Sequence, residues 1–132
     1  MPNLLRFYLV LTSIIVSFQF ALAFGAPWGD VAMAGQYPGV MPAPIRIAAA
    51  IQGLLLMSLA GIVATRIGYI LPKWYGLSRR LIWLVVGINV MSTIMNLATP
   101  VMLERVLWSP VAIGLLVCSL MVALQKTKAP DN

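Results

Sequence analysis

Four apolar segments, each about as long as a bilayer is thick, constrain the fold of this chain most strongly. The chain has 132 residues, of which 61% are hydrophobic and 9% charged, whereas a soluble domain carries roughly 25% charged residues. An α-helix needs about 20 apolar residues to cross the hydrocarbon core. We therefore predict an all-α integral membrane four-helix bundle, a single domain of residues 1–132 with spans at 4–24, 45–67, 81–99 and 106–124.

The first apolar segment has two interpretations. Arg6 precedes it and Ala21, Leu22 and Ala23 resemble a cleavage site, as in a secretory signal peptide. The apolar run is long for such a peptide, however, and it carries Gln19 close to its end. We expect it to be a retained first span.

The basic residues are divided unevenly between the two predicted sides of the membrane. Four spans place both termini on one side, and cytoplasmic loops are usually the more basic ones. This predicts a multi-pass protein of the bacterial inner (cytoplasmic) membrane, with cytoplasmic termini and an outer loop at 25–44. It also explains the net charge of +6 without a nucleic-acid partner. The predicted cytoplasmic set is Arg6, Arg66, Lys73, Arg79, Arg80, Lys126 and Lys128, and the outer set is Arg46 and Arg105.

The composition excludes several kinds of chemistry. Histidine is absent and Cys118 is the one cysteine, so a Ser-His-Asp or Cys-His mechanism has no residues to build on. Histidine-held haem and zinc held by His/Cys clusters also lack ligands. We expect no cofactor, no metal site, no catalytic residue and no enzymatic activity.

Two of the predicted spans carry periodic patterns. In the third span, polar side chains recur at i, i+3, i+4 and i+7 and so share one helix face. Polar groups facing lipid would be unsatisfied, so we expect this face to point into the bundle. It would serve either interhelical hydrogen bonding or a polar ligand. The polar face consists of Asn89, Ser92, Thr93 and Asn96. In the second span, small residues recur at three- and four-residue steps and predict a face that packs closely against another helix. This face consists of Ala50, Gly53, Met57, Ala60, Gly61 and Ala64.

The segment 25–44 separates the first two spans and is neither strongly apolar nor basic. It is longer than the roughly 15 residues beyond which an unstructured connection becomes uncommon. Its apolar side chains, prolines and glycines predict an ordered cap, in which Asp30 caps a short helical turn over 31–34. The cap is either a lid that seals the helix ends or part of a ligand site.

Polar residues from three spans gather at the level of this cap, and two pairs of charged residues lie near them. Together they predict an outward-facing pocket under the loop. Its candidate residues are Gln19, Trp28, Asp30, Tyr37, Arg46, Gln52, Asn89, Asn96, Glu104 and Arg105.

Three motifs carry a resemblance to a known group of proteins. They are GAPWG at 25–29, GQYPGVMP at 35–42 before IRIA, and NLATPVMLERVLWSP at 96–110. The chain resembles small bacterial four-helix integral membrane proteins that form a domain of unknown function. The resemblance implies four inner-membrane helices and no catalytic residues. Some related groups have a histidine in the first span, where this chain has Phe18, Gln19 and Phe20.

Three functions are compatible with these features. The one we favour is a non-catalytic accessory subunit or binder of a lipid or small apolar ligand. Its partners would be membrane lipids, another membrane protein or a second copy of the chain. The alternative is a small oligomeric transporter or channel, although no carboxylate falls inside a predicted span. A membrane enzyme, with Asp30 and Glu104 as a carboxylate pair and Arg46 or Arg105 holding an anionic headgroup, is the third.

Overall fold

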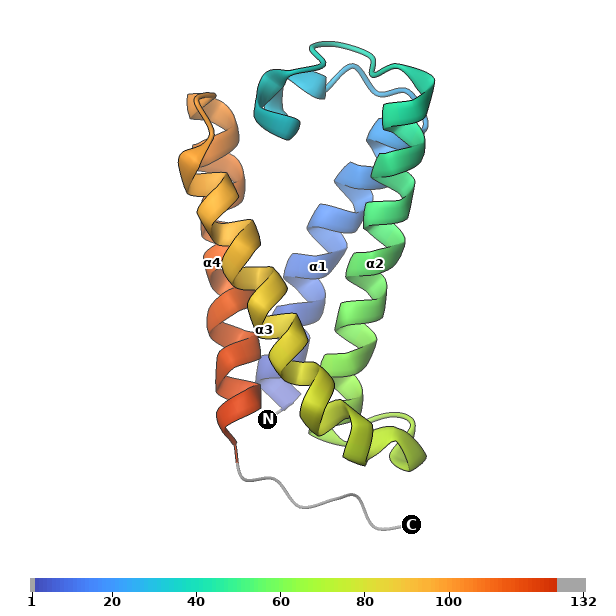
Figure 1. Cartoon of the computed structure of the whole chain (residues 1–132), viewed down its shortest axis with the longest axis vertical. Helices are drawn as coiled ribbons and strands as arrows, with labels where there is room; N and C mark the ends of the chain where they lie inside the picture. The colour runs from blue at the N-terminus through green and yellow to red at the C-terminus, as the bar shows by residue number, and fades with distance from the viewer. Residues whose placement is uncertain (1, 126–132) are drawn as a thin grey trace.

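The computed structural model of the chain describes residues 2–125 and consists of four long helices in an up-and-down bundle (Figure 1). Figure 1 shows both ends of the described chain at one end of the bundle and the α1–α2 connection at the other. We call the half with the loop 24–42 the loop half and the half with Pro2 and Leu124 the terminal half. The helices are α1 (Pro2–Ala23), α2 (Ala43–Ile67), α3 (Tyr75–Ala98) and α4 (Met102–Leu124), with short 3-10 turns at Gly29–Val31 (η1), Met33–Gly35 (η2) and Pro72–Trp74 (η3).

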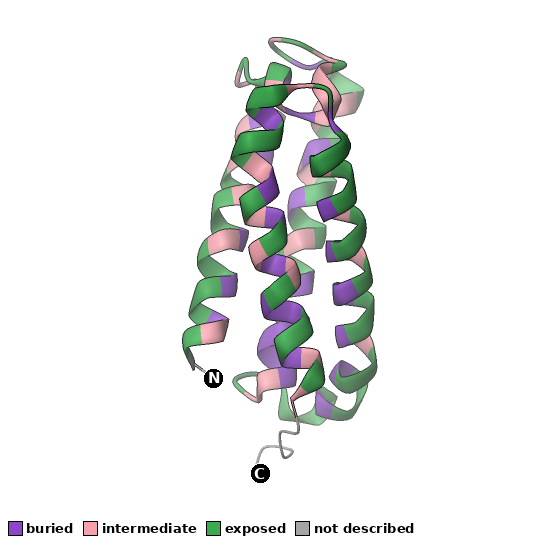
Figure 2. Cartoon of the chain, turned by 90° about the vertical axis from the view of Figure 1, so that its left-hand side faces the viewer, coloured by how far each residue is buried: buried purple, intermediate pink, exposed green. Residues whose placement is uncertain are grey.

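All four helices are long and apolar enough to cross a membrane. The expected all-α bundle with four such helices is therefore confirmed. Figure 2 shows that the buried positions lie on the inward faces of the helices, while exposed positions cover the outside. Many of the exposed side chains are large and apolar, among them Leu84, Ile94 and Val106. Such a surface suits contact with lipid rather than water.

All four helices begin before the predicted spans, the first two by two residues and the other two by more. The third begins at Tyr75 and the fourth at Met102, so the predicted starts at 81 and 106 are wrong. Pro110 lies inside α4 instead of ending the turn that precedes it. Transmembrane helices tolerate the loss of the backbone hydrogen bond that a proline cannot donate. Glu104 therefore lies within a candidate span, in the first turn of α4. Lys126 and Lys128 of the predicted cytoplasmic set lie outside the described residues.

The terminal half has a continuous apolar core. α1 packs mainly on α2 and α3 on α4, and the two helical pairs close against each other. The small-residue face of α2 is buried at Gly53, Ala60 and Ala64, as predicted, whereas Met57 is exposed. A Cβ at Gly53 would lie 3.1 Å from the ring of Phe20, so the absence of a side chain lets α1 and α2 approach closely. The core is built from Leu5, Tyr8, Leu59, Val63, Ile82, Val85, Leu115, Cys118 and Val122, among others.

A buried arginine joins three helices at the terminal end. Arg66, near the end of α2, donates hydrogen bonds to the hydroxyl of Tyr75 at 3.3 Å and to the carbonyl of Gln125 at 2.6 Å. Its guanidinium also lies 5.7 Å from the ring centroid of Tyr75, at cation–π distance. The side chain thus links the start of α3 and the end of α4 to α2.

Candidate functional site

A cavity of about 640 Å³ lies in the loop half, between α2 and α3. In Figure 1, α3 begins beside the end of α2 and then crosses toward α4, so α2 and α3 diverge toward the loop. α1 and α4 form the back wall of the cavity, and residues of η1 and η2 form its roof. The cavity is therefore enclosed by all four helices and by the α1–α2 loop.

Most of the cavity wall is apolar, and part of this apolar wall is also exposed. Leu55 of α2 is 47% exposed, and Met91 and Met95 of α3 are 59% and 68% exposed. These three residues line the cavity and reach the outer surface as well. They form the rim of an opening between α2 and α3, which in a membrane would face the lipid.

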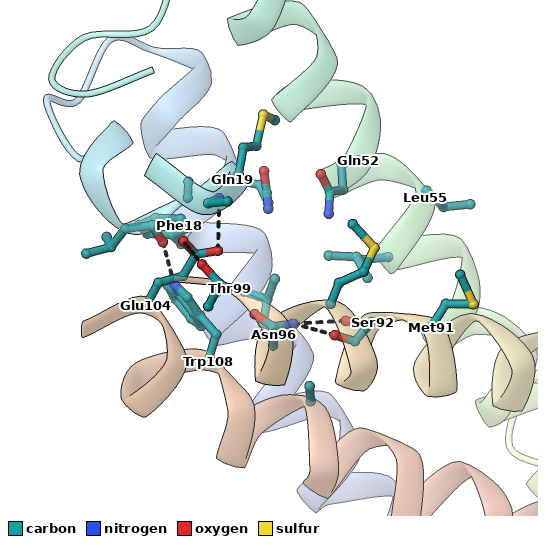
Figure 3. Close-up of a pocket in the computed structure, with 18 of the residues that line it drawn as sticks. Phe18, Gln19, Gln52, Leu55, Met91, Ser92, Asn96, Thr99, Glu104 and Trp108 are labelled. Atoms are coloured by element: carbon teal, nitrogen blue, oxygen red, sulfur yellow. Dashed lines mark hydrogen bonds between the residues drawn. The ribbon is translucent and has the colours of Figure 1, made fainter. Parts of the chain in front are cut away.

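Gln19 of α1 lies in the cavity wall with an unpaired amide oxygen. Its side chain is 9% exposed, and its Oε1 accepts no hydrogen bond within residues 2–125. Leaving a buried acceptor unpaired costs about 1–3 kcal/mol. Figure 3 shows the amides of Gln19 and Gln52 projecting from α1 and α2 toward Ser92 and Asn96 of α3. Gln19 therefore has an acceptor in the cavity wall that the fold leaves unpaired.

The polar face of α3 points into the bundle, as predicted: Asn89 and Thr93 are buried and Ser92 and Asn96 are half-buried. The Nδ2 of Asn89 lies 3.1 Å from Ser119 Oγ, 3.4 Å from Tyr8 Oη and 3.4 Å from the Leu115 carbonyl. Asn89 thereby connects α3 to α1 and α4.

Asn96, two helical turns closer to the loop than Asn89, has partners on its own helix. Its Nδ2 donates to the carbonyl of Ser92 at 2.7 Å and to the hydroxyl of Ser92 at 3.3 Å. These bonds hold the amide against α3 and leave the carbonyl oxygen of the side chain without a partner in the described chain.

Glu104 is a buried carboxylate in the cavity wall. It is 7% exposed, and its position in the first turn of α4 is one that the helix dipole favours for an acid. Its Oε2 accepts from Thr99 Oγ1 at 3.1 Å and its Oε1 accepts from the backbone N–H of Ala34 at 3.4 Å. Among the described residues, no lysine or arginine lines the cavity or forms an ion pair with Glu104.

The loop is docked on the helices as an ordered roof. Trp108 Nε1 of α4 donates to the carbonyl of Val31 at 3.0 Å, and the bond from Ala34 to Glu104 gives a second link to α4. The ring of Phe18 in α1 lies 4.5 Å from that of Trp108 and 6.1 Å from that of Trp28. A small apolar core, including Leu22, Ala32, Met41 and Ala49, lies under the loop.

The loop also closes on itself at Gly29. The N–H of Gly29 donates to the carbonyl of Gly39 at 2.9 Å, and a Cβ at Gly29 would lie 1.8 Å from the carbonyl oxygen of Tyr37. Asp30 lies within η1, and its Oδ1 accepts from the N–H of Gly39 at 2.9 Å. The prediction that Asp30 caps a turn over 31–34 is therefore wrong, because its carboxylate is used to close the loop.

Six of the ten candidate pocket residues line the cavity, and four do not. Trp28 stacks on Phe18 and is half-exposed, and the carboxylate of Asp30 is turned to Gly39. Arg46 Nε donates to the carbonyl of Ala23, and Arg105 donates to the carbonyl of Thr99. The expectation that these four belong to the pocket is corrected by their bonds. The six that line it are Gln19, Tyr37, Gln52, Asn89, Asn96 and Glu104.

Sequence reasoning missed several residues of the wall. Met91 and Met95 lie one turn apart on the same side of α3, and Trp108 lies one turn after Glu104 on α4. The helical period starting from Ser92 and Glu104 could have indicated them. Asp30 is not in the wall, so the structure does not bring the carboxylates of Asp30 and Glu104 together in this cavity.

A comparison of the chain with protein-family models, curated proteins and solved structures finds no match. The resemblance to small bacterial four-helix membrane proteins stays a prediction from the motifs. The function is therefore inferred from the cavity itself.

Proposed function

We propose that this protein is a non-catalytic, multi-pass protein of the bacterial inner membrane that binds a lipid or a small apolar ligand in the cavity under its loop. One observation carries the proposal: the cavity opens sideways between α2 and α3, through a rim of exposed apolar side chains. A ligand dissolved in the bilayer can enter through such a rim without crossing water.

The size and chemistry of the cavity support this function. Its volume of about 640 Å³ falls within the roughly 300–1,000 Å³ of small-molecule sites. Such sites are usually apolar with a few well-placed polar groups, and this one combines Leu55, Leu56 and Ile88 with the amides of Gln19 and Gln52. The docked roof covers the cavity at the loop end, so the membrane side is its more open side.

The packed terminal half favours binding over conduction. The core around Val63, Ile82 and Val85 continues below the cavity, so a solute in the cavity meets closely packed apolar side chains rather than a path onward. For this reason a small oligomeric transporter or channel remains the less favoured function. An accessory role beside another membrane protein or a second copy is compatible with ligand binding.

We place the loop outside the cytoplasm and both termini inside, because most basic residues then face the cytoplasm. A reporter that is active only outside the cytoplasm, fused after Asn132, should be silent under this orientation. Activity of that fusion would reverse it, and the cavity would then open near the inner leaflet.

Filling the cavity tests the proposed function. Ser92 lines the cavity and is half-buried, whereas Val90 on the same helix is exposed and does not line it. The variants Ser92→Phe and Val90→Phe therefore add the same ring inside and outside the cavity. The full chain is purified in a mild detergent, and retained lipids and other ligands are measured by native mass spectrometry and extraction.

We expect the wild type and Val90→Phe to retain the same amount of the same ligand. Ser92→Phe should bind it at least about tenfold more weakly, which is equivalent to about 1.4 kcal/mol of binding free energy. Thermal unfolding of each variant shows whether it is folded. A folded Ser92→Phe variant with undiminished ligand, or a wild type with nothing bound, would contradict the proposal.

A further inference from the structure

The cavity has an electrostatic character that its apolar rim does not reveal. Glu104 is the one acidic side chain in its wall, and none of the described residues lining it is basic. The carboxylate accepts one hydrogen bond on each oxygen, whereas a carboxylate has about four lone-pair sites. It can therefore accept further bonds from a donor inside the cavity, and an anionic group there would find no cation to pair with.

A second acceptor lies buried in the same wall. The Oε1 of Gln19 is buried and finds no donor within residues 2–125. A buried unpaired acceptor is destabilising on its own, so a donor that fills the cavity would restore what the fold leaves unsatisfied. Gln19 and Glu104 come from α1 and α4 and do not bond each other, so they are independent indications of a donor group.

The acidic group and the membrane-facing rim of the wall lie at different ends of the cavity. Figure 3 shows Glu104, Thr99 and Gln19 at one end, whereas Leu55 and Met91 lie at the other. The helix positions agree, because Glu104 is in the first turn of α4 while Leu55 is about 18 Å along α2 from its start, at about 1.5 Å per residue. An occupant that matches this arrangement has a donor head and an apolar tail.

We propose that the ligand is an amphiphile with a primary ammonium head and an alkyl tail, with the head between Glu104 and Gln19 and the tail along the apolar end to the opening. This inference rests on the proposed function. An ammonium carries three donors and no acceptor, so it satisfies Gln19 Oε1 and neutralises the buried carboxylate together. A hydroxyl head would supply the donor but not the charge.

Two sources could supply this chemistry: a membrane lipid with an amino headgroup, or a free single-chain amine. The cavity holds the head and the first part of the tail in either case, and the opening lets a longer or second chain extend into the bilayer. The shared feature is a primary ammonium on an alkyl chain, and the experiment separates the sources.

The test is a titration of the purified full chain in a neutral detergent, with dodecylamine, dodecanol and dodecanoic acid compared by native mass spectrometry. We expect dodecylamine to bind at least about tenfold more tightly than dodecanol, and dodecanoic acid to bind most weakly. Lipids extracted from the purified protein are compared with the bulk membrane. Enrichment of amino lipids identifies the lipid source, and its absence with the amine preference intact identifies the free amine.

Three variants assign the head site. Glu104→Gln should lower dodecylamine affinity about tenfold and change dodecanol affinity by less than about twofold. Gln19→Leu should weaken both ligands. Asp30→Asn removes an acid that lies outside the cavity and should leave the amine preference unchanged. Because Gln19→Leu changes the same head site from a different helix, the location of this site does not depend on Glu104→Gln alone.

The outcomes separate this inference from the proposed function. Equal binding of amine, alcohol and acid that Ser92→Phe abolishes would overturn the ammonium head and leave the apolar site standing. An amine preference that survives Glu104→Gln would also overturn it. Absence of binding by all three amphiphiles, or binding that Ser92→Phe does not reduce, would remove the proposed function as well.

Discussion

Two buried amides of the cavity wall, Asn89 where the cavity meets the apolar core of the terminal half and Gln19 in the loop half, are held in very different ways. Asn89 is 2% exposed and its Nδ2 has three acceptors, on α1 and α4. Gln19 is 9% exposed, and its Oε1 has no partner in the described chain. In lipid no water replaces a missing partner, so the first amide serves the structure and the second is left unpaired in the wall of the proposed ligand site.

The difference follows from how the helices are held. In the terminal half, Arg66 links α2 to α3 and α4, and Ala60 and Ala64 of α2 lie in the shared apolar core. In the loop half, α2 and α3 diverge, and the roof spans the helix ends through Val31 and Ala34. Buried polar side chains therefore do not by themselves mark the proposed ligand site. Buried polar groups without hydrogen-bond partners do.

The largest effect should come from the loop half, at Gly29. A methyl group there would lie 1.8 Å from the carbonyl oxygen of Tyr37, so Gly29→Ala should disrupt the closed loop. We expect a loss at the upper end of the roughly 1–3 kcal/mol of overpacked substitutions, together with loss of retained ligand. Thermal unfolding in detergent and native mass spectrometry measure the two effects.

Gly61→Ala is the matched control, because a Cβ at Gly61 has no neighbour within 4 Å. It should be neutral or stabilising by up to about 1 kcal/mol, the helix propensity difference between glycine and alanine. If Gly29→Ala unfolds at the same temperature as Gly61→Ala and retains ligand, the close packing of the loop at Gly29 is not needed for stability or for binding.

An intermediate effect is expected from Asn89→Leu, where the cavity meets the terminal half. The change keeps a similar volume but removes the donor shared by Tyr8, Leu115 and Ser119. Interhelical hydrogen bonds in membranes contribute about 0.6 kcal/mol on average and up to about 1.7, so we expect a loss of about 1–2 kcal/mol. Denaturation in mixed micelles measures it, and wild-type stability would show that the network contributes nothing.

The smallest effect on stability should come from Gln19→Leu in the ligand-free protein. Removing an amide whose buried oxygen has no partner also removes its desolvation penalty. We expect stability within about 0.5 kcal/mol of wild type or somewhat higher, in the same micelles as Asn89→Leu. A loss of unfolding free energy as large as that of Asn89→Leu would contradict the proposed difference between the two amides.

Local patterns were sufficient for a large part of the fold. The four helices follow from apolar length, and the inward polar face of α3 follows from helical period. The early starts at Tyr75 and Met102 did not follow, because apolar length marks only the stretch after charged residues such as Arg80 and Arg105, and the helices extend past these residues. Six of the ten candidate pocket residues line the cavity, and the sequence indicated them by their level in the predicted spans, by the polar face of the third span or by their place in the loop.

What the sequence by itself determined is the set of helices, the polarity of their faces and the presence of an ordered loop, since each depends on residues within a few turns of one another. Only the tertiary structure decided which polar groups are paired. Asn89 meets Tyr8 across 81 positions, and Glu104 meets Ala34 across 70. A hydrogen bond depends on distances of a few tenths of an ångström between such distant segments, and helical period carries no information about them.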